Sequence, residues 1–246
     1  MLPAPMPCNL ALVAEVCQQN TDGTSSRKRI TCIVWLPRIQ DGPMSRLFSA
    51  ISPYWLWVLL ALPAGGMIAE VSESPSPRAI HELLHPTGEF AARFMIIALM
   101  ATPLAMIFKG WRGPRWLMKN RRYFGVAAFG YGLVHTVVYL VDAGALARIL
   151  GEALRLEIWT GWLAFFIFIP LAATSMDYFV RVMGSRWKAL HRWVYGAAIL
   201  TLVHWAALHD WGGLGPALVH FVPLGLLQVY RIWYQFARRR QSTVAR

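Results

Sequence analysis

The chain has 246 residues, of which 57% are hydrophobic and only 15% are charged, and its formal net charge is +12. Because soluble domains carry about 25% charged residues, this composition excludes an ordinary soluble protein and favours a membrane protein. The basic residues lie between long apolar runs, as in cytoplasmic loops, so we expect no nucleic-acid partner despite the positive charge.

The first 43 residues differ in character from the rest of the chain. They contain a polar stretch over 18–29 and three cysteines without a Cys-x-x-Cys pair, which predict no disulfide framework. No basic segment precedes an apolar one with a cleavage site, so we expect no signal peptide. We predict that 1–43 is an N-terminal extension, either disordered or the result of a start codon assigned too early. Residues 44–246 then form the membrane domain.

Six apolar runs follow, each with about the 17–25 residues that a helix needs to cross the hydrocarbon core. They do not show the short alternating pattern of membrane-spanning strands. Several contain proline, which membrane helices tolerate better than soluble helices do. We therefore predict an all-α bundle of about six transmembrane helices, at 53–70, 90–108, 123–141, 158–175, 189–208 and 214–236.

The charges of the connecting loops alternate along the chain. The loops after the second and fourth runs and the C-terminal end are rich in Lys and Arg, whereas the loop after the first run holds three Glu against one Arg. Because cytoplasmic loops carry an excess of Lys and Arg, we predict that both termini are cytoplasmic. The sequence shows no convincing internal repeat, so a transporter built from inverted halves gains no support.

Two histidines lie well inside predicted spans, His135 in the third and His204 in the fifth. Ionisable residues in a span are costly and are candidates for function. Both lie toward the non-cytoplasmic side, and two imidazoles at matching depth on neighbouring helices can ligate a haem iron from both faces. Small residues before His135 would let a flat macrocycle approach the backbone. Two histidines that hydrogen-bond across helices are the alternative interpretation.

A second group of candidates lies near the cytoplasmic interface. His191 precedes His204 by 13 positions, about 20 Å along a helix, and the two do not share a face of a straight helix. A kink or a helix end would be needed to direct both toward one column of cofactors. Arg121 precedes His135 by 14 positions, about 21 Å and near the same face. For both residues a cofactor role and a solvated basic loop are open.

The loop after the first span contains HELLH at 81–85, which matches the His-Glu-x-x-His pattern of zinc proteases. That chemistry needs His81 and His85 as ligands on one helical face and Glu82 as a base. The motif lies in a short loop before Pro86, where no domain can form a cleft, so a short amphipathic helix is favoured. We interpret His209 and His220 as interfacial residues with local hydrogen bonds, with contact to a quinone or a partner open for either.

Several segments match a known family in order and spacing. They are the stretch from Arg121 to His135, RWKALHR at 186–192, and VHW at 203–205, with shorter pieces at 87–88, 102–104 and 171–175. Together they resemble the ferric-reductase-like transmembrane family over about residues 50–240. The resemblance is nearest to the haem-binding membrane subunits of bacterial methionine-sulfoxide reductase systems.

The resemblance implies a b-type haem held by His135 and His204. It gives His191 the place of a third cofactor-associated histidine, as for a second haem, while Arg121 stands where two-haem relatives carry another histidine. It further implies FMN, a quinone or flavin reductase as electron donor, and a periplasmic molybdopterin-containing reductase subunit as acceptor. The chain itself would be a non-catalytic electron-transfer subunit of an oxidoreductase in the bacterial inner membrane.

The segment after His204, WAALHD at 205–210, diverges from the family pattern. A stand-alone electron carrier of the same family with another acceptor is therefore one alternative. A small-solute transporter whose histidines line a polar path is another, and it predicts a colourless protein. A membrane metalloprotease that uses His81 and His85 is a third, and it predicts bound zinc.

Overall fold

The computed structural model describes residues 15–19, 30–34, 43–73 and 76–244. The chain divides into two units, Met1–Ser52 and Pro53–Arg246. In the first unit, strands β1 (Glu15–Gln19) and β2 (Ile30–Val34) pair antiparallel, with Cys17 opposite Cys32. The other residues of 1–42 lie outside the described ranges. The disordered extension and the early start codon both stay predictions.

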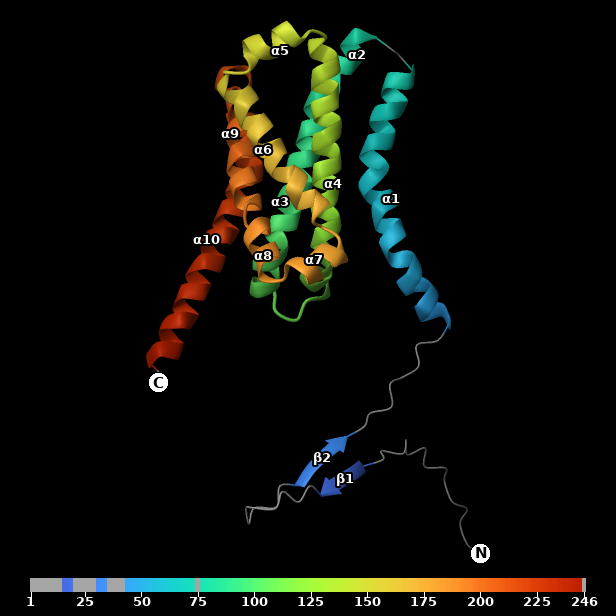
Figure 1. The fold of residues 1–246 in the computed structure, drawn as a ribbon, viewed down its shortest axis with the longest axis vertical. Coiled ribbons are helices and arrows are strands. Elements are labelled where there is room, and N and C mark those ends of the chain that lie inside the picture. The colour runs from blue at the N-terminus through green and yellow to red at the C-terminus, as the bar shows by residue number, and fades with distance from the viewer. Residues whose placement is uncertain (1–14, 20–29, 35–42, 74–75, 245–246) are drawn as a thin grey trace, which may run out of the picture. The chain divides into compact units, whose positions relative to one another are not determined.

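Helices make up nearly all of the second unit. Six long helices cover the six predicted spans, and four short ones lie in the connections, which confirms the all-α membrane bundle (Figure 1). Within the described residues the helices are α1 (Pro43–Glu73), α2 (Pro77–Glu82), α3 (Leu84–Ile107), α4 (Arg112–Ala143), α5 (Leu146–Glu152), α6 (Leu156–Ala173), α7 (Asp177–Met183), α8 (Ser185–His191), α9 (Val194–Trp211) and α10 (Leu214–Val244).

Four helical stretches among the described residues are long and apolar enough to cross a membrane, where six were predicted. They are Tyr54–Glu73, Arg78–Ile107, Arg112–Ala143 and Leu156–Ala173. The two further predicted spans correspond to α9 and α10, which form long helices but are not among these four stretches. The sequence of α9 includes His204 and Asp210, and α10 ends in an arginine-rich segment.

Two helix boundaries differ from the predicted spans. α4 begins at Arg112 rather than near 123, because Pro114 falls in its first turn, where a missing N–H is harmless. Most of the basic loop is therefore helix. α9 begins at Val194 rather than 189, and a turn with a Trp193 N–H bond to the Leu190 carbonyl separates it from α8. This break places His191 on a helix of its own.

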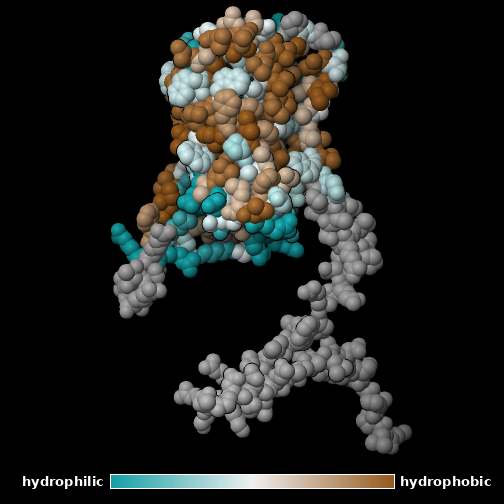
Figure 2. Space-filling view, in the orientation of Figure 1, coloured by the Kyte–Doolittle hydropathy of each residue, from teal (hydrophilic) through white to brown (hydrophobic). Residues whose placement is uncertain are grey.

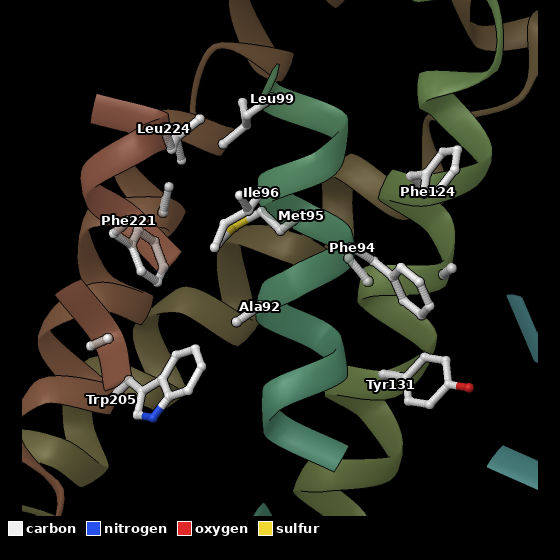
Figure 3. Packing of buried hydrophobic residues seen from close by; sticks show 14 of the residues in the cluster. Ala92, Phe94, Met95, Ile96, Leu99, Phe124, Tyr131, Trp205, Phe221 and Leu224 are labelled. Atoms are coloured by element: carbon white, nitrogen blue, oxygen red, sulfur yellow. The ribbon is translucent and has the colours of Figure 1, made fainter. Parts of the chain in front are cut away.

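The bundle is built around two close helix pairs, α3 with α4 and α6 with α9, and α10 packs on both α3 and α9. Figure 3 shows α3 between α4 and α10, with Phe94 and Tyr131 on the α4 side and Phe221 on the α10 side. Small buried residues such as Ala92 on α3 and Ala128 on α4 let the helices approach closely. Helix packing in these pairs sets the positions of α4, which carries His135, and of α9, which carries His204.

One tyrosine joins α1 to the rest of the bundle. The Tyr131 hydroxyl donates to the Leu60 carbonyl and accepts from the Ala64 N–H, both at 2.9 Å. In a regular helix these two groups of α1 would bond to each other. Pro63 lies next to them and has no N–H of its own. The hydroxyl therefore bonds to both backbone groups of one turn of α1, beside this proline.

The surface of the second unit fits a membrane environment. Figure 2 shows hydrophobic side chains over the middle of the bundle and hydrophilic ones gathered at one end. That end holds α7, α8 and the connection from α3 to α4, as Figure 1 shows. A broad apolar surface of this kind has no place in water but suits the hydrocarbon core of a bilayer.

Candidate functional site

His135 on α4 and His204 on α9 lie opposite each other inside the bundle. Their ring centroids are 6.1 Å apart and their planes meet at 80°. The structure thus brings together the two histidines that the sequence places at matching depth, although 69 positions separate them (135 to 204). A cavity between α3, α4, α6 and α9 contains both rings.

Each ring is held through its Nδ1 atom by a backbone carbonyl of a neighbouring helix. His135 Nδ1 donates to the Leu84 carbonyl oxygen at 3.0 Å, with Thr87 Oγ1 3.2 Å from the same nitrogen. His204 Nδ1 donates to the Glu157 carbonyl oxygen. A carbonyl oxygen only accepts, so Nδ1 carries the proton in both rings and Nε2 keeps a lone pair. This is the tautomer that binds a metal through Nε2.

Among the residues that the structure describes, the hydrogen bonds of both rings are made by Nδ1, and none is made by Nε2. Histidine ligands of metals usually donate their other ring N–H to a carbonyl or carboxylate, which fixes the ring and raises its basicity. Both rings already have this second partner. Their Nε2 atoms are therefore held in a fixed orientation, with the lone pair available for a metal.

The cavity around the rings is apolar and has aromatic walls. Its lining includes Met95, Tyr139, Trp162, Phe165, Phe168 and Trp205. Apolar pockets with few polar groups are typical of cofactor sites. The cavity therefore combines an apolar, aromatic lining with two opposed nitrogen donors.

The residues fit a haem with two axial imidazoles. Two imidazole–metal bonds of about 2 Å each, together with the two ring radii, separate the ring centroids by roughly 6 Å, which agrees with the observed 6.1 Å. No cluster of three or more His, Cys, Asp or Glu in the described ranges can hold a metal ion. A metal ion here would have two protein ligands and would take the others from a macrocycle, as in haem proteins.

His191 and Arg121 lie near each other but are held by different partners. His191 Nε2 is 3.1 Å from Thr174 Oγ1, and its ring stacks on Trp187 at 4.0 Å. Arg121 donates to Thr102 Oγ1 at 3.0 Å. Burial lowers the pKa of His191, and the guanidiniums of Arg122 and Arg121 lower it further. The imidazole at the end of α8 is therefore neutral near pH 7, which is the ligating form.

The HELLH stretch does not form one helical face. α2 ends at Glu82 and α3 begins at Leu84, so His81 and His85 belong to different helices. His81 Nδ1 lies 3.1 Å from Asp142 Oδ1, and Glu82 accepts from Arg78 Nε at 2.9 Å. The short helix α2 ends inside the motif rather than containing it, and the arrangement that a zinc protease needs is not formed.

The remaining two histidines lie at the start of α10 and at the end of α9. His220 Nδ1 donates to the Pro216 carbonyl oxygen at 2.8 Å, which confirms the predicted local hydrogen bond. Its Nε2 also accepts from Arg93 Nε on α3 at 3.3 Å. The side chain of His209 lies outside the described residues.

An exposed ion pair joins α4 to α7, between Arg122 and Asp177. The hydrogen bond from Arg122 and its charge lower the pKa of the Asp177 carboxyl below its ordinary 3.8. The pair therefore stabilises the folded protein above about pH 4. This contribution is lost as the pH falls through the lower folded-state value.

We expect Asp177→Asn to lower the Tm at pH 7 by no more than about 2 °C, because exposed pairs contribute little. The difference from wild type should be smaller at pH 3 than at pH 7, because the carboxyl gains a proton as the pH falls toward its folded-state pKa. Thermal unfolding of the detergent-solubilised protein at both pH values measures this, and a large difference that persists at pH 3 would contradict it.

Sequence reasoning missed the groups that orient the two histidines. They are the carbonyls of Leu84 and Glu157, and the glycines Gly88 and Gly161, which leave room for the rings. Every residue type has a backbone carbonyl, so the sequence does not mark which carbonyl bonds to a histidine. The one available signal is the Thr-Gly pair that occurs at 87–88 and again at 160–161.

Comparison with known proteins places the chain in a family. Residues 87–202 match the family model described as "Ferric reductase like transmembrane component". This range includes His135 and ends two positions before His204. The comparison with solved structures gave no match.

Several relatives carry the name "Protein-methionine-sulfoxide reductase heme-binding subunit MsrQ". The chain is 34% identical to the one from Azospira oryzae over 197 residues, 77% of this chain and 82% of the relative. It is 31% identical to that from Ralstonia nicotianae over 200 residues, 77% and 88% of the two chains. For Yersinia pseudotuberculosis the identity is 31% over 154 residues, 61% and 70%. The chain belongs to the MsrQ family of ferric-reductase-like transmembrane proteins.

Proposed function

We propose that the chain is a membrane electron-transfer subunit that holds a haem b between His135 and His204. The observation that carries the proposal is the pair of opposed imidazoles, each with Nδ1 bonded to a carbonyl and with Nε2 unengaged. The relatives' printed name, a heme-binding subunit, and the transmembrane family support it independently.

The chain's own groups would set the properties of this site. The Leu84 and Glu157 carbonyls hold the two rings in orientation and increase the basicity of Nε2. The aromatic and aliphatic walls of the cavity exclude water, which helps to set the reduction potential. When bound, the haem supplies a one-electron carrier, and the protein supplies position and environment.

The electron donor and the electron acceptor extend this proposal. We propose the quinone pool or a flavin reductase as donor and a periplasmic molybdopterin-dependent methionine-sulfoxide reductase as acceptor. The relatives' name, which includes protein-methionine-sulfoxide reductase, supports this acceptor. A stand-alone electron carrier with another acceptor is the second candidate, favoured by the divergent segment 205–210. FMN stays a prediction, which quantification of flavin released from the purified protein tests.

We place the protein in the bacterial inner membrane with both termini cytoplasmic. The hydrophilic end of the bundle, with α7 and α8, would then face the cytoplasm, and the His135–His204 cavity would lie toward the other side. Reporter fusions test this. A cytoplasm-active reporter should work at the C-terminus, and a periplasm-active one in the 144–155 connection, and the reverse pattern would contradict the orientation.

A spectrum tests the central proposal. The purified full-length chain should be coloured, show a b-type reduced-minus-oxidised difference spectrum, and release non-covalent protohaem in a pyridine assay. A colourless protein from haem-sufficient cells would overturn the proposal and favour the small-solute transporter.

We further propose that His191 and Arg121 mark the site where electrons enter the protein at its cytoplasmic end, by contact with a second cofactor or with the electron donor. His191→Ala should leave the spectrum of the His135–His204 haem intact, because His191 does not contact that cavity. It should slow reduction of this haem by a cytoplasmic donor in membrane vesicles, measured by stopped-flow absorption. Loss of the main spectrum, or an unchanged rate, would contradict the proposal.

A further inference from the structure

Each buried histidine is held by the same local structure, on two different helices. In the first turns of α3 and of α6 a carbonyl accepts from the histidine, a buried threonine follows three positions later, and a glycine follows four positions later. The two sets are Leu84, Thr87 and Gly88 for His135, and Glu157, Thr160 and Gly161 for His204.

The two glycines leave no room for a side chain beside the rings. A Cβ atom built at Gly161 would lie 2.8 Å from His204 Nδ1 and 2.9 Å from its Cε1. One built at Gly88 would lie 3.0 Å from His135 Cε1 and 3.1 Å from Nδ1. The first approach is closer than real Cβ contacts allow, and the second is tight. Any side chain at these positions would displace the ring.

The position of the glycine explains how the ring reaches the carbonyl. A side chain on a helix covers the turn that precedes its own Cα, so the residue at i+4 shields the carbonyl of residue i. With glycine at 88 and 161, the Leu84 and Glu157 carbonyls are open from the side. Each accepts the Nδ1–H of its histidine in addition to the hydrogen bonds from its own helix.

The threonines act on the same carbonyls. Thr87 Oγ1 donates to the Leu83 and Leu84 carbonyls, at 2.7 and 3.1 Å. Thr160 Oγ1 does the same with Leu156 and Glu157, at 2.6 and 3.3 Å. Both side chains are only 1% exposed. Each hydroxyl thus uses its hydrogen within its own helix, so it does not donate to the Nε2 atom of the neighbouring histidine.

The two sets also occur in the same chain order. α3 and α6 both begin at one end of the bundle, and α4 and α9, which carry the histidines, both return toward that end (Figure 1). Each half of the site therefore consists of a helix whose carbonyl orients the imidazole, followed in the chain by the helix that carries the histidine. The whole-chain sequence shows no repeat, yet the site consists of two equivalent halves.

We propose that Gly88 and Gly161 are positioning residues for the haem, one in each half, because the missing side chain admits each imidazole to its carbonyl. This rests on the proposed haem function. The roles are unequal: His204 is the more tightly confined ring, and its partner glycine is the less replaceable of the two.

Alanine substitutions of the full-length protein test the proposal. Gly161→Ala should weaken haem affinity about 10–100-fold, as loss of an outer-shell partner does. Gly88→Ala should keep the haem but change its low-spin EPR signal and its reduction potential. Gly130→Ala on α4 is the matched control, because nothing lies within 4 Å of a Cβ there, and it should leave haem content, EPR and potential unchanged.

The outcomes separate this inference from the proposed function. A wild-type protein without haem would overturn both. A wild-type protein with bis-imidazole haem, together with Gly88→Ala and Gly161→Ala variants of unchanged affinity, EPR and potential, would overturn the positioning role alone. If Gly161→Ala does not fold, as judged by size-exclusion chromatography, Gly88→Ala decides. Its ring needs to move by only a few tenths of an ångström, so that variant should fold.

Discussion

Replacing His204 by glycine is expected to remove haem from the purified protein, and free imidazole is expected to restore it. His204 presents an unengaged Nε2 toward His135 from a position that the Glu157 carbonyl fixes. Loss of an axial ligand should weaken binding by more than the roughly 100-fold that loss of an outer-shell partner can cost. His135→Gly should behave in the same way, since the one further histidine among the lining residues, His85, has a side chain that is 69% exposed.

The measurement is haem per protein after purification, with and without imidazole during haem loading. His220→Ala is the control: it removes an imidazole from the same end of the bundle, but one whose two nitrogens are already bonded to Pro216 and Arg93. It should retain the full b-type spectrum. Full haem content in His204→Gly without imidazole would rule out His204 as an axial ligand.

Phe94→Ala is expected to destabilise the bundle by about 3–5 kcal/mol, the usual cost of deleting a buried aromatic ring. Phe94 is 9% exposed and packs between α3 and α4 against Tyr131, Phe90 and Phe124, at centroid distances of 5.3, 5.9 and 6.3 Å (Figure 3). The cavity left behind would also loosen the α3–α4 pair, which holds His135 on the Leu84 carbonyl. Haem affinity should therefore fall along with stability.

Denaturation of the detergent-solubilised protein, followed by circular dichroism and by the haem spectrum, measures both effects. Phe236→Ala is the matched control on α10, because its ring is 61% exposed and its loss leaves no internal cavity. That variant should unfold like wild type. Equal stability of Phe94→Ala and Phe236→Ala would show that the α3–α4 packing does not support the fold as described.

The sequence was sufficient to predict the helical bundle and its two central histidines. Hydrophobic runs longer than a membrane's thickness leave few alternatives to spanning helices, and a histidine inside such a run is costly enough to indicate function. The pairing of His135 with His204 followed from equal depth. The structure brings the two rings together.

Other features could not be predicted, for physical reasons. The break between α8 and α9 depends on a turn at 192–193 without proline or glycine, so no residue type marks it, and His191 was placed at the start of a longer helix. The carbonyls that hold the histidines belong to the backbone. Gly88 and Gly161 resemble other glycines in apolar helices until the opposite ring is in place.

The most direct test is low-temperature EPR of the oxidised, purified wild-type protein. If His135 and His204 bind one iron from opposite faces, one haem per chain should give a low-spin ferric signal with two imidazole ligands. A predominantly high-spin, five-coordinate signal, or a protein that binds no haem at all, would contradict ligation by this pair.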